Sequence, residues 1–173
     1  ACRRSGRSSA YARSYQLADL HGVNLRGSVT WAFLCEDQPY FDGFRDLATN
    51  GIDKPVMNVF RMLGRMSGDR VAVTSTGALP VEEVRDKSVR GPADIAAFAT
   101  RAARSAAVLV WNYHDDDLPA PASNVELTIA GLPAVRPTVT HFRVDNDHGN
   151  SYTRWKAMGS PQPPSAAQIG HLR

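Results

Sequence analysis

Two neighbouring carboxylates, Glu36 and Asp37, follow directly after a run of mostly apolar residues over 27–35. Carboxylates at the carboxyl end of a barrel strand are where catalytic and substrate-binding groups lie. Trp31, five residues before Glu36, offers an indole face to a sugar ring. A retaining glycosidase needs two carboxyl groups ~5–5.5 Å apart across the scissile bond, which chain neighbours rarely supply. Glu36 and Asp37 are therefore a poor acid–nucleophile pair, and a loop acid beside a core tryptophan is the alternative.

Two later loops are rich in aspartate. His114–Asp117 offers oxygen ligands of the kind that calcium or magnesium prefers, but it lacks the D-x-[DN]-x-[DN]-G spacing of a calcium loop, so we interpret it as a turn. Asp145–Asn150 is typical of a connection locked by its own side chains. The chain has no P-loop or G-x-G-x-x-G motif, and neither Cys2 nor Cys35 has a partner base. The sequence thus gives no catalytic residue, no metal ligand and no cofactor.

The elements around Glu36 follow a helix–strand–helix order. Apolar spacing predicts a helix over Ser9–His21 that stops at Gly22, and the run Gly27–Cys35 is typical of a strand buried on both faces. Asp53 and Pro55 predict the cap and first turn of a second helix, which ends near Gly64. This order is one segment of an α/β barrel, but 173 residues are too few for the ~250 of a complete barrel.

The rest of the chain has short β-rich runs separated by turn residues, which predict an antiparallel β-sandwich. The runs are Val71–Ser75, Asp94–Thr100, Ala106–Tyr113, Val125–Ala130 and Thr138–Val144. The alanines of Asp94–Arg104 are equally compatible with a helix. We therefore predict a mainly β protein with a barrel remnant over 1–67, an accessory β-sandwich over 68–150 and a proline-rich tail over 151–173.

Composition narrows the partners. Hydrophobic residues make up 43% and charged residues 21% of the chain, the balance of a globular protein. No apolar run approaches the ~20 residues of a membrane span, so a membrane partner is not expected. The net charge of +3 comes mainly from Arg3, Arg4, Arg7 and Arg13, a short terminal arm. A nucleic-acid partner is not expected either, because the chain lacks a basic stripe with stacking aromatics.

Longer strings of residues carry a resemblance to a known family. They include Thr30–Phe33, Glu36–Arg45, Asn50–Met62, Val108–Asp117, Arg143–Asp145, Asp147–His148, Trp155–Lys156, Met158–Pro161 and, upstream, Leu17–Asp19 and His21–Leu25. Together they resemble glycoside hydrolase family 39, and the bacterial β-xylosidase branch most. The resemblance covers nearly the whole chain from about Ala10.

The resemblance implies a (β/α)8 barrel with an accessory β-sandwich that hydrolyses β-xylosides with retention through two glutamates. The family's acid/base follows an Asn-Glu dipeptide, which this sequence lacks, and the nucleophile strand is absent too. By resemblance, Trp31 forms the platform under the xylose, Glu36 contacts its hydroxyls and Phe44 walls the subsite. Leu34-Cys35 departs from the Glu-Phe that the resemblance leads us to expect there.

The resulting hypothesis is a C-terminal fragment of a β-xylosidase that is inactive by itself and takes a xylo-oligosaccharide as its ligand. Without the rest of a barrel, the strand Val29–Leu34 and the helix around Phe60 expose apolar surface, which predicts a homo-oligomer. The alternative is a carbohydrate-binding or structural β-sandwich module. Its candidate aromatics are Trp111, Tyr113, Tyr152 and Trp155, which equally suit an internal interface.

Overall fold

A computed structural model describes residues 6–30, 37–43, 46–116, 122–132 and 136–173. These residues form five helices and two antiparallel sheets, so the fold is mixed α/β. The helices are α1 (Gly6–Leu20), α2 (Pro55–Leu63), α3 (Val81–Lys87), α4 (Ser151–Ala157) and α5 (Ala166–Leu172). The strands are β1 (Ala48–Thr49), β2 (Ile52–Asp53), β3 (Asp69–Val71), β4 (Asp94–Arg101) and β5 (Ala106–Tyr113).

The larger sheet has the order β3-β4-β5, and its longest pairing is the β4–β5 hairpin, from Asp94↔Tyr113 to Arg101↔Ala106. One face of the hairpin packs on α1, where Ala12, Ala96 and Trp111 form a buried cluster that Phe98 and Tyr113 extend. Alternate residues of β4 therefore point into this cluster. The other face of the hairpin also carries apolar side chains, among them Ile95 and Val110, and Val110 is exposed.

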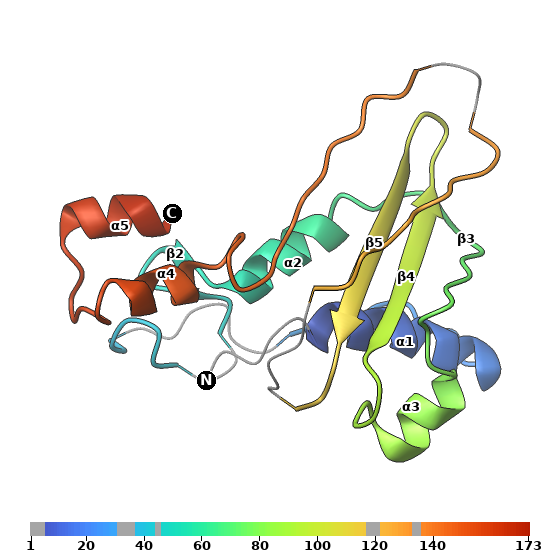
Figure 1. The fold of residues 1–173 in the computed structure, drawn as a ribbon, viewed down its shortest axis with the longest axis horizontal. Coiled ribbons are helices and arrows are strands. Elements are labelled where there is room, and N and C mark those ends of the chain that lie inside the picture. Colours follow the sequence, from blue (N-terminus) through green and yellow to red (C-terminus); the bar gives the residue numbers. More distant parts are fainter. Residues whose placement is uncertain (1–5, 31–36, 44–45, 117–121, 133–135) are drawn as a thin grey trace.

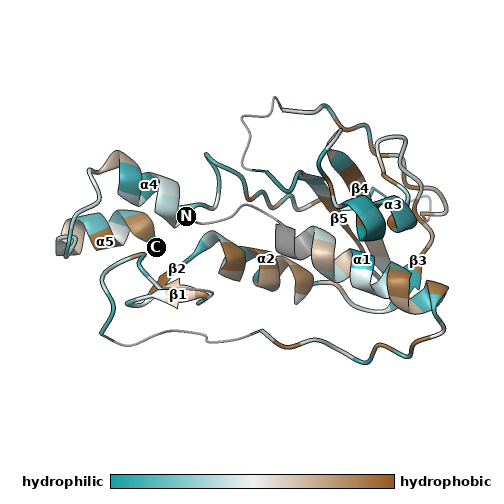
Figure 2. Ribbon diagram, turned by 90° about the horizontal axis from the view of Figure 1, so that it is seen from below, coloured by the Kyte–Doolittle hydropathy of each residue, from teal (hydrophilic) through white to brown (hydrophobic). Residues whose placement is uncertain are grey.

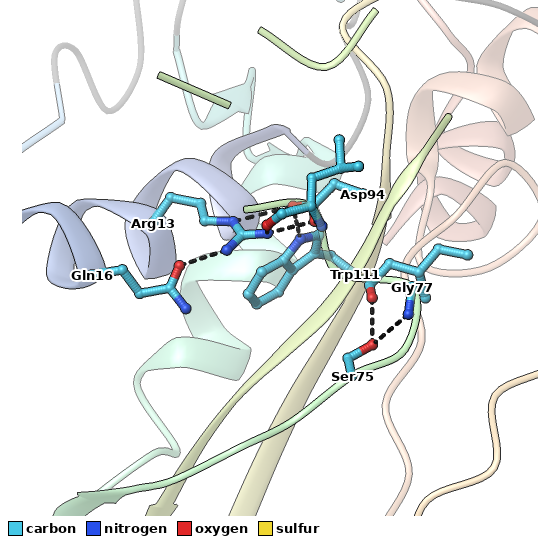
Figure 3. Close-up of polar contacts among 8 residues, drawn as sticks. Arg13, Gln16, Ser75, Gly77, Asp94 and Trp111 are labelled. Atoms are coloured by element: carbon cyan, nitrogen blue, oxygen red, sulfur yellow. Dashed lines mark hydrogen bonds and ion pairs between the residues drawn. The ribbon is translucent and has the colours of Figure 1, made fainter. Parts of the chain in front are cut away.

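A buried ion pair joins α1 to the hairpin (Figure 3). The Arg13 guanidinium donates to the Asp94 carboxylate, with Nη2···Oδ1 at 2.5 Å and Nε···Oδ2 at 3.2 Å. Trp111 Nε1 donates to the same carboxylate at 2.8 Å, and Leu79 N at 3.0 Å. Asp94 is 0% exposed, so its charge is stable there only because all these donors meet it.

A second group of elements lies at the other end of the molecule, with α2 between the two groups (Figures 1 and 2). It comprises the β1–β2 hairpin, α4 and α5, around a core of Ile52, Trp155 and Leu172. Figure 1 shows that the C-terminal helices lie beside β2, although about a hundred residues separate them in the chain. Residues 151–173, expected as a tail, thus contain two helices, and α5 begins with a capping box at Ser165 and Gln168.

The two predicted helices near the N-terminus are confirmed, with one correction. Gly22 follows α1 with a φ of 65°, and Pro55 is in the first turn of α2. The N-cap of α2 is Lys54, which makes no side-chain capping bond, and the prediction of Asp53 as the cap is wrong. Asp53 belongs to β2 and forms an ion pair with Arg61 at 2.7 Å.

The buried strand predicted over Gly27–Cys35 is wrong for the part that the structure describes. Residues 27–30 have no strand structure, and Val29 is 99% exposed; the rest of that range lies outside the described residues. A strand buried on both faces is typical of the interior of a parallel sheet, which other elements cover on each face. Both sheets of the described residues are antiparallel, so they offer none.

The predicted β-sandwich is not confirmed, although two of its five predicted strands are present. Asp94–Thr100 and Ala106–Tyr113 are strands, which excludes the helical alternative for β4, while the strand predicted at Val71–Ser75 is shorter and earlier, as β3. Residues 125–130 and 138–144 are not strands, because the described residues give them no strand to pair with. The prediction of a mainly β chain is therefore corrected to mixed α/β, and a sheet packed face to face on β3-β4-β5 is not confirmed.

Candidate functional site

The three predicted substrate-binding residues, Trp31, Glu36 and Phe44, lie outside the described residues. The structure describes the segment that connects the last two, residues 37–43, which we call the connecting segment. Any site built on Glu36 and Phe44 must adjoin this segment, because the two residues flank it in the chain. The connecting segment is therefore the described part of the candidate site.

Hydrogen bonds from two directions fix the backbone of the connecting segment. From the C-terminal side, the Gln162 side chain accepts from Tyr40 N at 2.8 Å and donates to Tyr40 O at 2.7 Å. From the β1–β2 hairpin, Thr49 Oγ1 accepts from Phe41 N at 2.9 Å, and Asn50 Nδ2 donates to Gln38 O at 3.1 Å. Phe41 has a φ of 61°, which a bulky residue rarely adopts, so these contacts hold a strained conformation.

The connecting segment and α4 form the two walls of an open pocket of about 200 Å³. Three aromatic rings lie together there: the Phe41 centroid is 5.0 Å from that of Trp155 and 5.8 Å from that of Tyr152. Lys156 Nζ lies 5.7 Å from the Tyr152 centroid and 5.6 Å from the Trp155 centroid, a cation–π arrangement. The lining residues are Pro39, Tyr40, Phe41, Asp42, Tyr152, Trp155, Lys156 and Gln162.

The pocket combines an apolar floor with polar groups at its opening. Trp155 is buried and donates its Nε1 hydrogen to Pro161 O at 3.1 Å, while Asp42, Lys156 and Gln162 are exposed. Small-molecule sites typically pair aromatic surface with a few fixed polar groups in this way. The arrangement suits binding of a polyhydroxylated ring. Among the described residues that line the pocket, Asp42 is the single carboxylate. This lining therefore has no pair of carboxylates that could cleave a glycoside.

A locked turn positions α4. Asp145 Oδ1 accepts from Asp147 N and His148 N, each at 2.8 Å, and from His148 Nδ1 at 2.9 Å. Burial by itself raises the pKa of the Asp145 carboxyl, but the hydrogen bonds from His148, Asp147 N and Arg143 outweigh it and hold that pKa well below its usual range. Asn150 then caps α4 by accepting from Thr153 N, which confirms the expected side-chain locking of Asp145–Asn150.

Two further contacts dock this turn and α4 on α2 and β2. Asn58 Nδ2 in α2 donates to Gly149 O at 2.9 Å, and Ser151 Oγ donates to Asp53 O at 2.5 Å. At the end of the connecting segment, a Cβ on Gly43 would lie 2.2 Å from Asp46 Oδ2, so glycine is required there. Asp46 itself forms a buried ion pair with Lys54. The walls of the pocket are thus fixed by buried or docked neighbours.

The other predicted loop, His114–Asp117, is described as far as Asp116. His114 Nδ1 accepts from Asp116 N at 3.0 Å, and Asp115 accepts from Val89 N and from the Tyr113 hydroxyl, so these side chains stabilise a turn. Within the described residues, no group of three or more potential ligands could hold a metal ion. No helix among the residues that the structure describes is long and apolar enough to span a bilayer.

The structure divides the four candidate aromatics of the alternative module. Trp111 and Tyr113 pack against α1, and Trp111 is buried, whereas Tyr152 and Trp155 line the pocket. Sequence reasoning did not identify Tyr40, Asp42, Lys156 or Gln162 as site residues, although all four lie in or beside the strings that carry the family resemblance. Their proximity depends on a contact between residues 122 positions apart, which no local pattern signals.

Comparisons with known proteins agree with the resemblance. The model of the family "Glycosyl hydrolases family 39" matches residues 15–173. A curated relative, the beta-xylosidase of Caldicellulosiruptor saccharolyticus, is 26% identical over 134 residues, which cover 78% of this chain and 25% of that protein. The chain thus spans about a quarter of the length of this relative. No solved structure matches the chain.

Proposed function

The chain belongs to glycosyl hydrolases family 39, and from this membership we propose that it is the C-terminal part of a β-xylosidase-like glycoside hydrolase. The substrate class is xylo-oligosaccharides or xylan fragments, cleaved with retention by the whole protein. The observation that carries the proposal is the pocket of the connecting segment and α4, because its aromatic and polar side chains include residues of the segment that Glu36 and Phe44 flank in the sequence.

Within this function, Trp31 forms the platform under the sugar, Glu36 accepts hydrogen bonds from its hydroxyls and Phe44 closes one side of the subsite. Support comes from the connecting segment between Glu36 and Phe44, whose backbone is held by Gln162, Thr49 and Asn50. A fixed backbone favours sugar binding because less conformational freedom is lost when the ligand arrives.

The 173 residues by themselves are proposed to be catalytically inactive. The resemblance implies that the acid/base glutamate lies in an Asn-Glu motif, and this sequence contains no Asn-Glu dipeptide. Retaining hydrolysis needs two carboxyl groups on opposite sides of the glycosidic bond, and loss of one member of such a pair costs orders of magnitude in rate.

Two structural features belong to the same proposal. First, residues 125–130 and 138–144, which are not strands within this chain, form the second layer of a sandwich in the whole protein. Support comes from the hairpin face that carries Ile95 and Val110, because apolar sheet surface is normally covered by another layer. Second, the chain forms a homo-oligomer. The exposed apolar side chains Val29 and Val139 support it, since such surface associates in water.

A specific observation also favours the alternative of a carbohydrate-binding module. Tyr152 and Trp155 line an open pocket of the described residues, and the resemblance assigns neither of them to the substrate. In this alternative the chain binds glycan and takes no part in cleavage. Retarded migration of the chain in a native gel that contains xylan supports binding, and unretarded migration leaves the domain with a structural role.

The main test measures release of nitrophenol from an aryl β-xyloside by the purified chain, with Glu36→Gln as the matched variant. We expect no release above the buffer rate from either protein. Release by the wild type that disappears in the variant contradicts the proposed inactivity, because it requires a complete site around Glu36. Adding the remainder of a family 39 barrel as a separate polypeptide should restore hydrolysis with wild-type Glu36 and much less with Glu36→Gln.

A further inference from the structure

The pocket between the connecting segment and α4 has recognition groups of its own. Its floor consists of the Phe41, Tyr152 and Trp155 rings, whose centroids lie 5.0–5.8 Å apart. Such a floor contacts the apolar C–H face of a ring-shaped ligand. The described lining adds Asp42 and Lys156 to these rings, and the resemblance assigns none of these residues to the substrate.

The charges at the opening indicate what kind of ligand fits. Asp42 and Lys156 have opposite charges, both side chains are exposed, and no ion pair of the described residues uses either of them. A carboxylate accepts hydrogen bonds and an ammonium donates them, so a hydroxyl-rich ligand satisfies both. Because the two charges cancel, a neutral ligand fits better than a uronic acid or an amino sugar.

Size limits the ligand to about one ring. Pockets for drug-sized ligands occupy ~300–1,000 Å³, whereas this one measures about 200 Å³ and is open to solvent. We propose that the pocket is a binding site for one neutral pyranose ring at the end of an oligosaccharide. The ring contacts the aromatic floor, its hydroxyls donate to the Asp42 carboxylate, and Lys156 Nζ donates to its oxygens.

Gln162 makes this site preformed. Its amide holds Tyr40 N and Tyr40 O simultaneously, so the wall that carries Phe41 and Asp42 stays at a fixed place opposite α4. Ordering that wall then costs little when a sugar binds. The identity of the ring as xylose rests on the proposed function, whereas the site and the neutral pyranose class rest on the pocket alone.

The test is a titration of the whole ¹⁵N-labelled chain with xylobiose, followed by two-dimensional NMR. The Trp155 indole N–H and the Gln162 side-chain amide report from inside the pocket, and both should shift in a saturable manner. The variants Asp42→Asn and Lys156→Gln should each weaken binding about tenfold, the usual value of a hydrogen bond to a charged group. The matched controls Asp69→Asn and Lys87→Gln change exposed residues of β3 and α3 and should bind as the wild type does.

Each outcome is decisive. Absent or non-saturable shifts with both xylobiose and maltose overturn the site, and so does wild-type affinity in both pocket variants. Binding of glucuronic acid in preference to xylobiose overturns the neutral class. If maltose binds through Asp42 and Lys156 and xylobiose does not, the pyranose site stands and the xyloside part of the proposed function fails. If Glu36→Gln alone abolishes xylobiose binding, the proposed function stands and this site fails.

The variants also need a control for folding. Asp42 and Lys156 are exposed, so their replacement should not unfold the chain. The dispersion of each NMR spectrum shows whether the variant is folded.

Discussion

Gln162 holds Tyr40 by both of its backbone polar groups, with N···Oε1 at 2.8 Å and O···Nε2 at 2.7 Å, across 122 positions of sequence. A side-chain amide thus pairs with a main-chain amide as a neighbouring strand would. The contact ties the connecting segment to the C-terminal helices. The backbone conformation of the segment that follows Glu36 therefore depends on a contact with a residue near the C-terminal helix α5.

Replacement of Gln162 by alanine should release Tyr40. The Tyr40 amide then loses its acceptor, and hydrogen–deuterium exchange at that position should accelerate about tenfold, the equivalent of one hydrogen bond. Gln162→Glu keeps the acceptor for Tyr40 N, so its effect on this amide should be smaller. Amides of β4 and β5 in the same experiment serve as the control and should not change. Equal exchange of Tyr40 in wild type and Gln162→Ala would mean that Thr49 and Asn50 suffice to hold the segment.

Sequence reasoning succeeded where the relevant physics is local. The helix ahead of Gly22, the proline that begins α2 and the β4–β5 hairpin are visible in spacing and residue type. It failed at Val29, because an apolar run is buried only where other elements cover it, and residues 27–30 belong to neither sheet of the described residues. It also missed α3, although Glu82 and Glu83 in the first turn and Arg85 and Lys87 in the last are typical helix-end charges.

The candidate site was predictable only in outline. Trp31, Glu36 and Phe44 came from the family resemblance, and they stay predictions because they lie outside the described residues. The pocket residues Lys156 and Gln162 come from a region expected to be a tail. Their place opposite Tyr40 depends on the core of Ile52, Trp155 and Leu172, and such tertiary packing leaves no short-range pattern.

Replacement of Asp94 by alanine should strongly destabilise the chain. The change leaves Arg13 as an uncompensated buried charge and removes the acceptor of Trp111 Nε1, and loss of one partner of a buried pair costs about 3–5 kcal/mol. Urea unfolding monitored by circular dichroism measures this as a lower midpoint. Asp86→Ala, at an exposed position of α3, should leave the midpoint unchanged. The double variant Arg13→Met, Asp94→Leu should recover much of the loss, because no buried charge is then left unpaired.

The Asp145 turn should make stability depend on pH in the acid range. The pKa of this carboxyl is lowered in the folded chain, so its contribution is present above the unfolded value of about 4 and is lost as the pH falls below it. The free energy of unfolding, measured between pH 7 and pH 2.5, should therefore fall below about pH 4. Asp145→Asn should be less stable at pH 7 and show a shallower fall. Residue 147 contacts Asp145 through its backbone N–H, so the stability of Asp147→Asn should depend on pH as that of the wild type does. Parallel curves for wild type and Asp145→Asn would contradict this role.

Self-association should follow from the exposed apolar side chains. Val29 is 99% and Val139 is 82% exposed, and a second chain that covered them would remove this apolar surface from water. Light scattering at micromolar concentration should therefore give a mass above the 18.8 kDa of one chain, and Val29→Ser together with Val139→Ser should shift it toward that value. Added salt should not dissociate the oligomer, because apolar contacts are not screened as ion pairs are. A wild-type mass of one chain across this concentration range would show that these side chains stay in water, and the homo-oligomer would have to be abandoned.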